Sequence, residues 1–555
     1  MGEAKGGALL RPQRHIDHPG DKPIFLGKGK GNFEPDSYEP TASGPGEGGK
    51  AHRLRIEQKQ EEEKLKGVYG FNQLASDEIS LNRTVPDTRE EECRHWDYPT
   101  SLPSASVILV FHNEGWSTLL RTVNSVINRS PPQFLHEVVL VDDKSELEHL
   151  HEKLDEELKK PYYRKVKLVR NAEREGLIRA RNNGAVAATG DVVVFLDAHC
   201  EVAFNWLPPL LAPIWENRKT LSVPVIDGIN WNDFSINPVY AAGSHSRGLF
   251  EWGMLYKEGQ LPPKEVAKQN HHSEPYWAPT HAGGLFAIDR EWFKELGWYD
   301  PGLWVWGGEN FELSFKVWMC GGSSVWVPCS RVSHVYRGHS CSSCHSGSLG
   351  NKFGGVPTTL RNYKRVIEVW MDPEYREFFY TREPLARLID HGDISAQLKM
   401  KEDMKCKSFD WFMTEIAYDV LEKYPKMPPN KHWGELKNQV IVINYCCHNF
   451  MTPRLAASAS TRLAVIHQRK LALQAAMALG ETRRVFQNAI NSKTGMRWLE
   501  ITTPQTIIPI CIVITVIIVR ASRYIIARYP SLLLIEMLWL WRKDFACEPH
   551  LWDGC

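Results

Sequence analysis

The feature that most constrains the fold is a series of short apolar runs that alternate with helix-like segments between residues 105 and 202. We expect strands at four of these runs, 107–111, 137–141, 165–169 and 192–196, and helices at 117–128 and 177–188. Strands that alternate with helices are typical of an α/β fold with a mostly parallel sheet. Because the first run is apolar throughout, we expect both faces of this sheet to be covered.

Polar residues follow three of the expected strands directly. They are His112-Asn113-Glu114, Asp142-Asp143 and Asp197-Ala198-His199. In open parallel sheets, ligands bind beyond the carboxyl ends of the strands. The sequence therefore predicts that these three stretches line one site.

The pair Asp197 and His199 is the main metal candidate. Residues i and i+2 of an extended chain face the same side, so both side chains can reach one cation. A carboxylate with an imidazole suits manganese better than calcium and is compatible with zinc. Taken alone, the pair is explained more simply as a capping aspartate beside a buried, hydrogen-bonded histidine. Its position beside two other polar strand ends favours the metal site.

Two further groups are candidates for binding a nucleotide. Asp143 can accept hydrogen bonds from a ribose or a base, and its alternative role is an Asx turn. Basic residues follow the third expected strand, at Arg174, Arg179 and Arg181. The forked guanidinium suits diphosphate oxygens, although for any one of these arginines a solvated helix face is the simpler reading.

The stretch Trp306-Gly307-Gly308-Glu309-Asn310 is the more specific motif. Two glycines allow the backbone to approach a ligand closely, and the Glu and Asn that follow can bind sugar hydroxyls or an incoming nucleophile. His334 follows a short expected strand at 325–327. A lone histidine is usually structural, but as a third ligand it would complete a metal site whose open positions phosphate oxygens fill.

Composition excludes some functions. The 555 residues include 67 basic and 66 acidic side chains, so the chain as a whole offers no polycation for nucleic acid. Its 12 cysteines are too sparse for a disulfide scaffold. Cys341 and Cys344 form a C-x-x-C without a second pair at zinc-ribbon spacing. The apolar run at 507–519 is too short to span a bilayer, which takes about 20 residues. No amino-terminal anchor or signal peptide is visible, and residues 1–50 are expected to be disordered.

Seven stretches in order resemble the polypeptide N-acetylgalactosaminyltransferases, the enzymes that begin mucin-type O-glycosylation. They are VILVFHNEGWSTLLRTVNSV, EVVLVDDKS, REGLIRAR, FLDAHCEV, AGGLFAIDREWF, WGGENFELSFKVW and CGGSSVWVPCSRVSHVYR. The resemblance covers residues 66–435. The stretch CKSFDWFMTEIAYDV looks most like members that prefer glycopeptide acceptors.

The resemblance implies a glycosyltransferase A type α/β fold, with a Rossmann-like nucleotide-binding half and an acceptor half. It also implies a UDP-GalNAc donor, an Mn²⁺ cofactor, and transfer of GalNAc to serine or threonine of polypeptides or glycopeptides with retention at the anomeric carbon. Its metal ligands correspond to Asp197, His199 and His334.

Other roles carried over from the family are those of the donor and acceptor contacts. Residues that match donor-binding positions are Asp143, Arg174, Ala198, Gly283, Gly284 and Trp306. Glu309 matches the polar group near the incoming hydroxyl, and Arg337 a residue that contacts the diphosphate. The resemblance also pairs Cys93 with Cys329 and Cys320 with Cys406, which implies the secretory pathway and the Golgi lumen. Membrane association is implied by the resemblance only.

The domain organisation expected on this basis has three parts. Residues 1–90 form a flexible stem, and residues 91–435 form the catalytic domain, with one subdomain at 102–213, a second at 270–337 and helices over 361–425. Residues 436–555 form a divergent tail in place of the family's ricin-like lectin domain, because the tail contains no Gln-x-Trp element. We expect this tail to add no sugar binding.

Departures from the family leave alternatives open. Ser333 stands where the family usually has glycine, and the loop at 338–356 does not align with the family's mobile loop. One alternative is therefore a catalytically weak relative that binds sugar nucleotide or a partner protein. Another is a processive polysaccharide synthase, which would need several membrane helices.

Overall fold

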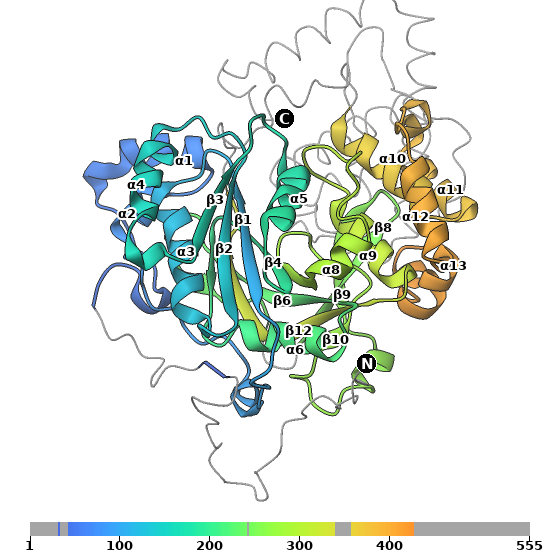
Figure 1. Ribbon diagram of the computed structural model, residues 1–555, viewed down its shortest axis with the longest axis horizontal. Coiled ribbons are helices and arrows are strands. Elements are labelled where there is room, and N and C mark those ends of the chain that lie inside the picture. The colour runs from blue at the N-terminus through green and yellow to red at the C-terminus, as the bar shows by residue number, and fades with distance from the viewer. Residues whose placement is uncertain (1–31, 34–42, 241–243, 339–356, 427–555) are drawn as a thin grey trace, which may run out of the picture. The chain divides into compact units, whose positions relative to one another are not determined.

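The computed structural model describes residues 32–33, 43–240, 244–338 and 357–426, all within one compact unit, Met1–Lys431. Its main sheet has ten strands in the order β10-β12-β6-β11-β4-β1-β2-β3, with β5 paired to β12 and β7 paired to β6. Figure 1 shows this sheet between helices on both sides. The expected tail at 436–555 and nearly all of the loop at 338–356 lie outside the described residues.

All four strands predicted from the apolar runs are confirmed. They are β1 (Ala105–Phe111), β2 (Leu135–Asp142), β3 (Val166–Arg170) and β4 (Val192–Asp197). The strands β4, β1, β2 and β3 are neighbours and run parallel. The predicted helices are α3 (Trp116–Arg129) and α5 (Leu177–Ala187). In Figure 1, α3 and α5 lie on opposite sides of β1 and β2.

Both faces of β1 are buried, which explains its continuous apolar sequence. Ile108 belongs to the same core cluster as Ile178 of α5. Val107 and Leu109 belong to the other cluster, which includes Leu119 of α3. Successive side chains of a strand point to opposite faces, so an apolar residue is needed at each position.

The remainder of the sheet is mixed rather than mostly parallel. Strand β11 (Phe286–Asp289) lies antiparallel between β4 and β6 (Thr220–Ile229), and β12 (Ser323–Val335) runs parallel to β6. The short strand expected at 325–327 is thus the start of a longer one. Short strands complete the sheet at β5 (Cys200–Val202), β7 (Ile236–Asn237) and β10 (Tyr276–Trp277). A separate hairpin joins β8 (Ser246–Glu251) and β9 (Leu255–Gln260).

Further helices lie along the described chain. Between the strands lie α4 (Glu152–Leu158), α6 (Leu207–Glu216), α7 (Pro263–Val266), α8 (Arg290–Glu295) and α9 (Glu309–Met319). The helical region expected at 361–425 is confirmed as α10 (Thr358–Trp370), α11 (Pro373–Arg382), α12 (Ser395–Asp403), α13 (Phe409–Trp411) and α14 (Val420–Lys423). Within the described ranges, no helix has both the length and the apolarity needed to cross a membrane.

The expectation of a flexible stem over residues 1–90 was wrong for residues 43–90. This segment contains α1 (Lys59–Tyr69) and α2 (Gln73–Glu78), and Phe71 and Ile79 are buried in a core cluster of their own. Arg83 is fully buried and donates from Nη2 to Glu201 Oε1 of β5 at 2.6 Å. The many charged residues of α1 suggested a solvent-exposed segment. Residues that follow α1 are instead held by contacts with segments more than a hundred residues away, as Arg83 is by Glu201.

Both expected disulfides are present. Cys93–Cys329 joins the short helix η3 (Glu91–His95) to β12 across 236 residues. Cys320–Cys406 joins the end of α9 to the chain before α13 across 86 residues. The remaining cysteine of the described chain, Cys200, is buried and free. The disulfides therefore hold β12 and α9, which border the candidate site, to distant segments.

Candidate active site

The side chains of Asp197, His199 and His334 converge at one point. Asp197 ends β4, and the chain then turns into β5, which pairs with β12 so that His334 lies opposite Cys200. One ligand atom from each of the three residues lies within 4.8 Å of the others. The Nε2 atom of His334 is 3.2 Å from Asp197 Oδ2, and the two histidine rings have centroids 4.8 Å apart. The three could therefore hold one cation.

His199 is oriented by a carboxylate behind it. Its Nδ1 lies 2.9 Å from Glu114 Oε2, which leaves Nε2 as the nitrogen available to a cation. Burial raises the pKa of the Glu114 carboxyl, but the charges of His199 and Arg337 outweigh this and lower the pKa to about 2. Burial, followed by the positive charge of Arg337, lowers the pKa of His199. His199 is thus favoured in the neutral form that metal binding requires.

Asp197 is held by a buried arginine. Arg181 of α5 donates from Nη2 to Asp197 Oδ1 at 3.3 Å and from Nη1 to the carbonyl oxygen of Gly283 at 2.6 Å. Burial alone would raise the pKa of Asp197, but the hydrogen bond from His334 and the charges of His334 and Arg181 lower it below the ordinary value. The Asp197 carboxylate is therefore ionised and fixed in position.

Gly283 and Gly284 face this carboxylate and Glu309. A Cβ atom added to Gly284 would lie 2.9 Å from Asp197 Oδ2. Gly283 has φ of +94°, in the left-handed region that favours glycine, and its added Cβ would lie 3.0 Å from the Cβ of Asn310. Glycine at 284 therefore lets the backbone lie against the Asp197 carboxylate, and glycine at 283 lets it lie against Asn310.

Glu309 is the first residue of α9 and lies near Gly283. Its Oε2 accepts a hydrogen bond from the N–H of Gly307 at 2.7 Å, and its Oε1 lies 4.0 Å from Nη1 of Arg181. Burial raises the pKa of Glu309, while Arg181 opposes that shift. Glu309, Arg181 and Asp197 thus form one group of charged side chains, of which Glu309 and Arg181 are buried and Asp197 is partly exposed.

The loop before α9 has an unusual backbone. Val305 has φ of +59° and Gly307 has φ of +96°, and the left-handed region is rare for a β-branched residue. Asn362 of α10 donates from Nδ2 to the carbonyl oxygens of Trp306 and Gly307, at 3.3 and 2.9 Å. Trp306 itself is 58% exposed. The loop is held by its backbone while the indole stays accessible.

Asp143, which follows β2 and is buried, lies beside Arg174, which follows β3. The Asp143 carboxylate accepts from the N–H groups of Glu175 and Gly176, both at 2.8 Å, and from Asn171 Nδ2 at 2.9 Å. Arg174 Nε lies 3.4 Å from Asp143 Oδ2. Asp143 therefore organises the loop that carries Arg174, through partners 28 to 33 residues away rather than through a local Asx turn.

Ala198 and Arg337 complete the set of predicted site residues. Ala198 is buried between the two metal candidates, and its carbonyl oxygen accepts from Thr122 Oγ1 at 3.0 Å. Arg337 donates from Nη2 to Glu114 at 3.1 Å and from Nε to the carbonyl oxygen of Tyr69 at 3.0 Å. Arg337 is thereby linked to His199 through their shared partner Glu114.

Sequence reasoning missed three contributors to the site. Glu114 was recognised only as part of a polar strand end, and Arg181 only as one of three candidate phosphate ligands. Phe71, in the segment taken for a stem, packs 6.3 Å from the ring of His199 and 5.7 Å from the guanidinium of Arg337. The sequence did contain a signal for Glu114, since metal-binding histidines commonly pair with a carboxylate and Glu114 lies at one of the polar strand ends.

The group of residues fits a divalent cation. It offers one ionised carboxylate and two imidazoles, and Glu114 fixes the orientation of one of them. The Nδ1 atom of His334 is buried without a hydrogen-bond partner. A ligand set of this kind suits manganese or zinc.

Comparison with known proteins gives the family. Residues 106–297 match the glycosyl transferase family 2 model, and residues 265–340 match the model described as the N-terminal domain of galactosyltransferase. N-acetylgalactosaminyltransferase 7 of Drosophila melanogaster is 58% identical over 433 residues, which are 78% of this chain and 72% of that protein. The chain belongs to the polypeptide N-acetylgalactosaminyltransferase family.

Other members of the polypeptide N-acetylgalactosaminyltransferase family show how far the match extends. The human N-acetylgalactosaminyltransferase 7 is 51% identical over 437 residues, which are 77% of this chain and 64% of that protein. A crystal structure of GalNAc-T7 with UDP, GalNAc and Mn²⁺ is 49% identical, with a TM-score of 0.69 over 75% of this chain and 76% of that one. The fold is therefore the glycosyltransferase A type implied by the sequence.

Proposed function

We propose that this protein transfers GalNAc from UDP-GalNAc to serine or threonine hydroxyls of polypeptides or glycopeptides, with Mn²⁺ held by Asp197, His199 and His334. The observation that carries the proposal is the convergence of these three side chains beyond the carboxyl end of β4. The related GalNAc-T7 structure, which contains UDP, GalNAc and Mn²⁺, supports the choice of ligands.

The first task of the site is to stabilise the departing UDP. A divalent cation at this site supplies positive charge to the diphosphate oxygens. Arg337 adds a guanidinium whose side chain is 34% exposed and which is already anchored by Tyr69 and Glu114. Because these contacts fix it before substrate binds, Arg337 stabilises the growing phosphate charge without a large reorganisation.

The sugar is assigned to the space beside Gly283 and Gly284. Glycine at 284 brings the backbone against Asp197, so a sugar held by this backbone would lie next to the metal site. Trp306 offers an exposed aromatic face at the same loop as Glu309. We assign Glu309 to orienting the sugar or the incoming hydroxyl, since its carboxylate is held by Gly307 and faces Arg181.

The nucleotide is assigned to the loop organised by Asp143. Asp143 holds the backbone at Glu175 and Gly176 and so positions Arg174. This loop follows β3 and is bound to Asp143 after β2, the neighbour of β1, where the strand order switches and open α/β sheets bind ligands. Arg174 then contacts the donor, while Asp143 acts largely by positioning it.

We propose that transfer proceeds with retention by attack on the same face of the sugar. The bond from the anomeric carbon to the phosphate oxygen breaks, the acceptor oxygen bonds to that carbon, and the leaving phosphate accepts the acceptor's proton. The site residues Asp197 and Glu309 are each held by arginine or backbone partners, which supports positioning roles rather than covalent attack. The two disulfides support a secretory-pathway location such as the Golgi lumen.

The test is a transfer assay with UDP-GalNAc on a peptide and on the matching glycopeptide. Stripping the protein with EDTA should abolish transfer, and added Mn²⁺ should restore it. Nuclear magnetic resonance of the product should show the α-linked sugar. Absence of transfer to both acceptors in Mn²⁺, by protein that binds UDP, would instead favour a weak or non-catalytic relative.

A further inference from the structure

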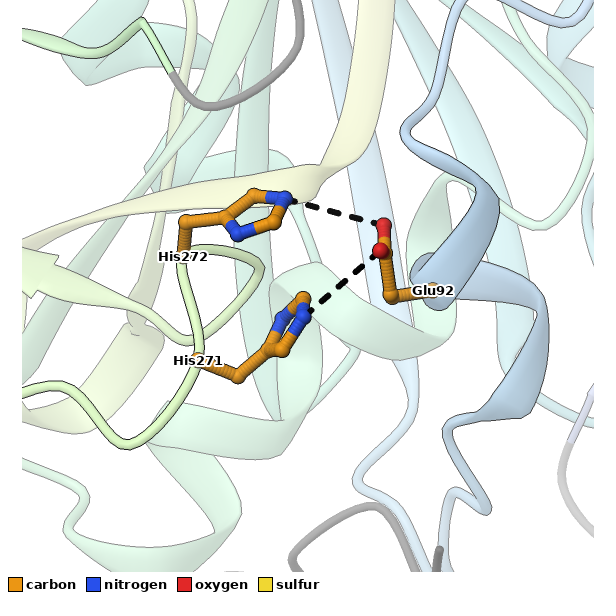
Figure 2. A group of neighbouring side chains, drawn as sticks. All are labelled: Glu92, His271 and His272. Carbon is orange, nitrogen blue, oxygen red and sulfur yellow. Dashed lines mark ion pairs between the residues drawn. The ribbon is translucent and has the colours of Figure 1, made fainter. Parts of the chain in front are cut away.

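We propose that Glu92, His271 and His272 form a second metal site, distinct from the candidate active site and suited to Zn²⁺. In this group, one possible ligand atom from each residue lies within 4.8 Å of those of the other two. Within the described residues, the active-site group Asp197, His199 and His334 meets the same criterion. Figure 2 shows both imidazoles directed toward the Glu92 carboxylate from the opposite segment of chain.

Each imidazole lies near the ligand spacing of a tetrahedral site from one oxygen of Glu92. His271 Nε2 lies 3.7 Å from Glu92 Oε1, and His272 Nε2 lies 3.6 Å from Glu92 Oε2. Ligands bound to zinc at about 2.0–2.1 Å in a tetrahedron are about 3.3 Å apart. A closure of a few tenths of an ångström therefore brings these pairs to coordination distance.

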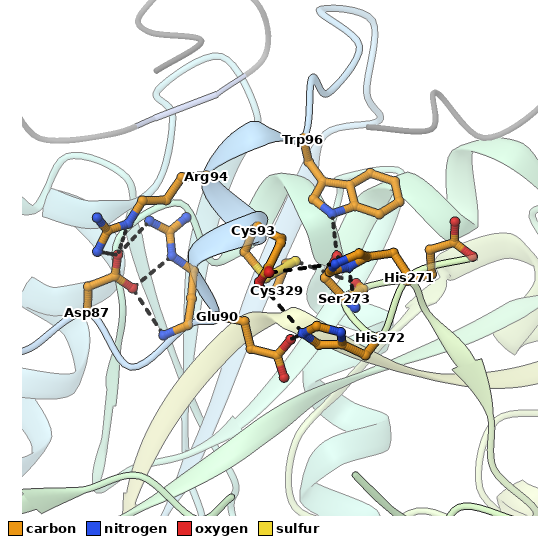
Figure 3. Close-up of a disulfide and its surroundings, with 12 residues drawn as sticks. Asp87, Glu90, Cys93, Arg94, Trp96, His271, His272, Ser273 and Cys329 are labelled. Carbon is orange, nitrogen blue, oxygen red and sulfur yellow. Dashed lines mark hydrogen bonds and ion pairs between the residues drawn. A yellow bond between two sulfur atoms is a disulfide. The ribbon is translucent and has the colours of Figure 1, made fainter. Parts of the chain in front are cut away.

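His271 has the kind of partner that orients a metal ligand. Its Nδ1 lies 2.8 Å from Ser273 Oγ, which accepts a hydrogen bond from Trp96 Nε1 at 2.9 Å. Figure 3 shows this chain of contacts beside the disulfide. With the proton on Nδ1, His271 donates to Ser273 and presents Nε2 to Glu92. The N–H of Ser273 donates to Nδ1 at 3.1 Å, which fits the other tautomer, with the proton on Nε2. Zinc binding would therefore move the proton from Nε2 to Nδ1.

A second carboxylate, that of Glu90, contacts Nε2 of His272. Glu90 is buried, its Oε2 lies 2.5 Å from His272 Nε2, and its Oε1 lies 3.1 Å from Nε2 of the buried His245. In the structure Nε2 of His272 pairs with Glu90, and a cation bound to this nitrogen would replace that hydrogen bond. Glu90 can then serve as a fourth ligand, since a carboxylate can take either role.

The chemistry favours zinc over harder cations. Two imidazoles and one or two carboxylates suit zinc and related transition metals, whereas calcium and magnesium prefer oxygen ligands alone. The side chains of Glu92, His271 and His272 are 42%, 21% and 37% exposed. An ion in solution can therefore reach them.

The site would brace one face of the catalytic fold. Glu92 lies in η3 next to Cys93, whose disulfide partner Cys329 is in β12, the strand that carries His334. His271 and His272 belong to the chain just before β10 (Figure 3). An ion would tie these two segments together beside the disulfide, a structural role that does not depend on the proposed transfer reaction.

The test is the zinc content and thermal stability of the full chain. Protein stripped with a chelator is loaded with Mn²⁺ and UDP to occupy the candidate active site, given Zn²⁺ and freed of loose ions by gel filtration. The wild type should retain one more zinc per chain than His271→Gln/His272→Gln and than Glu92→Gln. His136→Gln, which removes an exposed imidazole on β2, is the matched control and should behave as the wild type.

Stability gives the second readout. Zn²⁺ at a hundredfold excess over its Kd should raise the melting temperature of the wild type and of His136→Gln by about 3 °C, and leave the Glu92→Gln protein unchanged. Glu92→Gln is nearly isosteric at a partly exposed position, so it tests the site even where the double variant fails to fold. Equal zinc content and equal thermal shifts in the wild type and Glu92→Gln would overturn the proposal and leave the cluster as a set of ion pairs.

Discussion

The Nδ1 atom of His199 lies 2.9 Å from the carboxylate of Glu114, although 85 residues separate them in the chain. The same carboxylate accepts a hydrogen bond from Arg337. Glu114 thus connects a metal candidate with the arginine assigned to the diphosphate. We expect it to set both the orientation of the imidazole and the position of the guanidinium.

Replacement of Glu114 tests this connection. Glu114→Gln should weaken Mn²⁺ binding by about 10–100-fold, because partners of this kind orient the ligand and raise its basicity. Transfer should recover in part at high Mn²⁺ concentration, since the three ligands remain. Electron paramagnetic resonance titration of Mn²⁺ measures the affinity. Glu156→Gln, at an exposed ion pair on α4, is the control, and equal Mn²⁺ affinity in the two variants would contradict the assigned role.

The close approach of the Gly284 backbone to Asp197 gives a second prediction. A methyl group in Gly284→Ala would lie 2.9 Å from Asp197 Oδ2, so the carboxylate must move and transfer should fall at least about tenfold. Gly67→Ala is the matched control, because nothing lies within 4 Å of its added Cβ on helix α1. That change should keep full activity and add about 0.5–1 kcal/mol of stability. Normal kinetics in Gly284→Ala would show that Asp197 is not confined there.

The buried His281 predicts how stability depends on pH. Burial, followed by the charge of Arg181, lowers the pKa of His281 from 6.5 to about 3, and its Nδ1 accepts from the N–H of Gly283. A depressed histidine pKa stabilises the fold above pH 6.5, and this contribution is lost as pH falls toward 3 because the unfolded chain binds the proton first.

The variant His281→Asn separates this effect from other acid-sensitive groups. Its amide oxygen can accept from Gly283, but it does not titrate. Between pH 6.5 and 4.5, the free energy of unfolding of the wild type should fall by roughly 2 kcal/mol more than that of the variant. Urea denaturation at pH 6.5 and at pH 4.5 measures these free energies. An equal fall in the free energy of unfolding in the two proteins would show that His281 is not a buried neutral imidazole.

The disulfides give a prediction about folding. Peptide mapping without reduction should recover Cys93 linked to Cys329 and Cys320 linked to Cys406, with Cys200 unreactive in the native protein. The double variant Cys320→Ser/Cys406→Ser should have a free energy of unfolding lower by about 2–5 kcal/mol, because the unfolded chain regains the conformational entropy that the disulfide removes. Detection of all four as free thiols would exclude both pairs and the secretory location inferred from them.

The nucleotide-binding half could be predicted because its signals are local. In β1 and β4 each strand is a continuous apolar run, and the polar residues that follow mark where the strand ends. The i, i+2 spacing of Asp197 and His199 likewise lies within one short stretch. The position of His334 depends on the pairing of β12 with β5, which no periodicity reveals, and only the resemblance to the family supplied it.

Long-range contacts explain what the sequence did not show. The segment 43–90 was taken for a stem because α1 is dense in lysine and glutamate, yet Arg83 pairs with Glu201 and Tyr69 binds Arg337. The mixed part of the sheet was missed because β11 has only four residues, and the alternation in β6 does not reveal that the two strands pair antiparallel. Glu92, His271 and His272 gave no sequence signal either, since Glu92 lies far from the two histidines in the chain.

The central claim is that Asp197, His199 and His334 share one divalent cation that supports GalNAc transfer. The most direct test is the initial rate of transfer from UDP-GalNAc to a peptide, measured across a range of Mn²⁺ concentrations for the wild type and for His334→Ala. The wild-type rate should saturate with Mn²⁺, and the variant, folded by circular dichroism, should stay at least about 100-fold slower at every concentration. A variant rate that reaches the wild-type value at the same Mn²⁺ concentrations would contradict the claim.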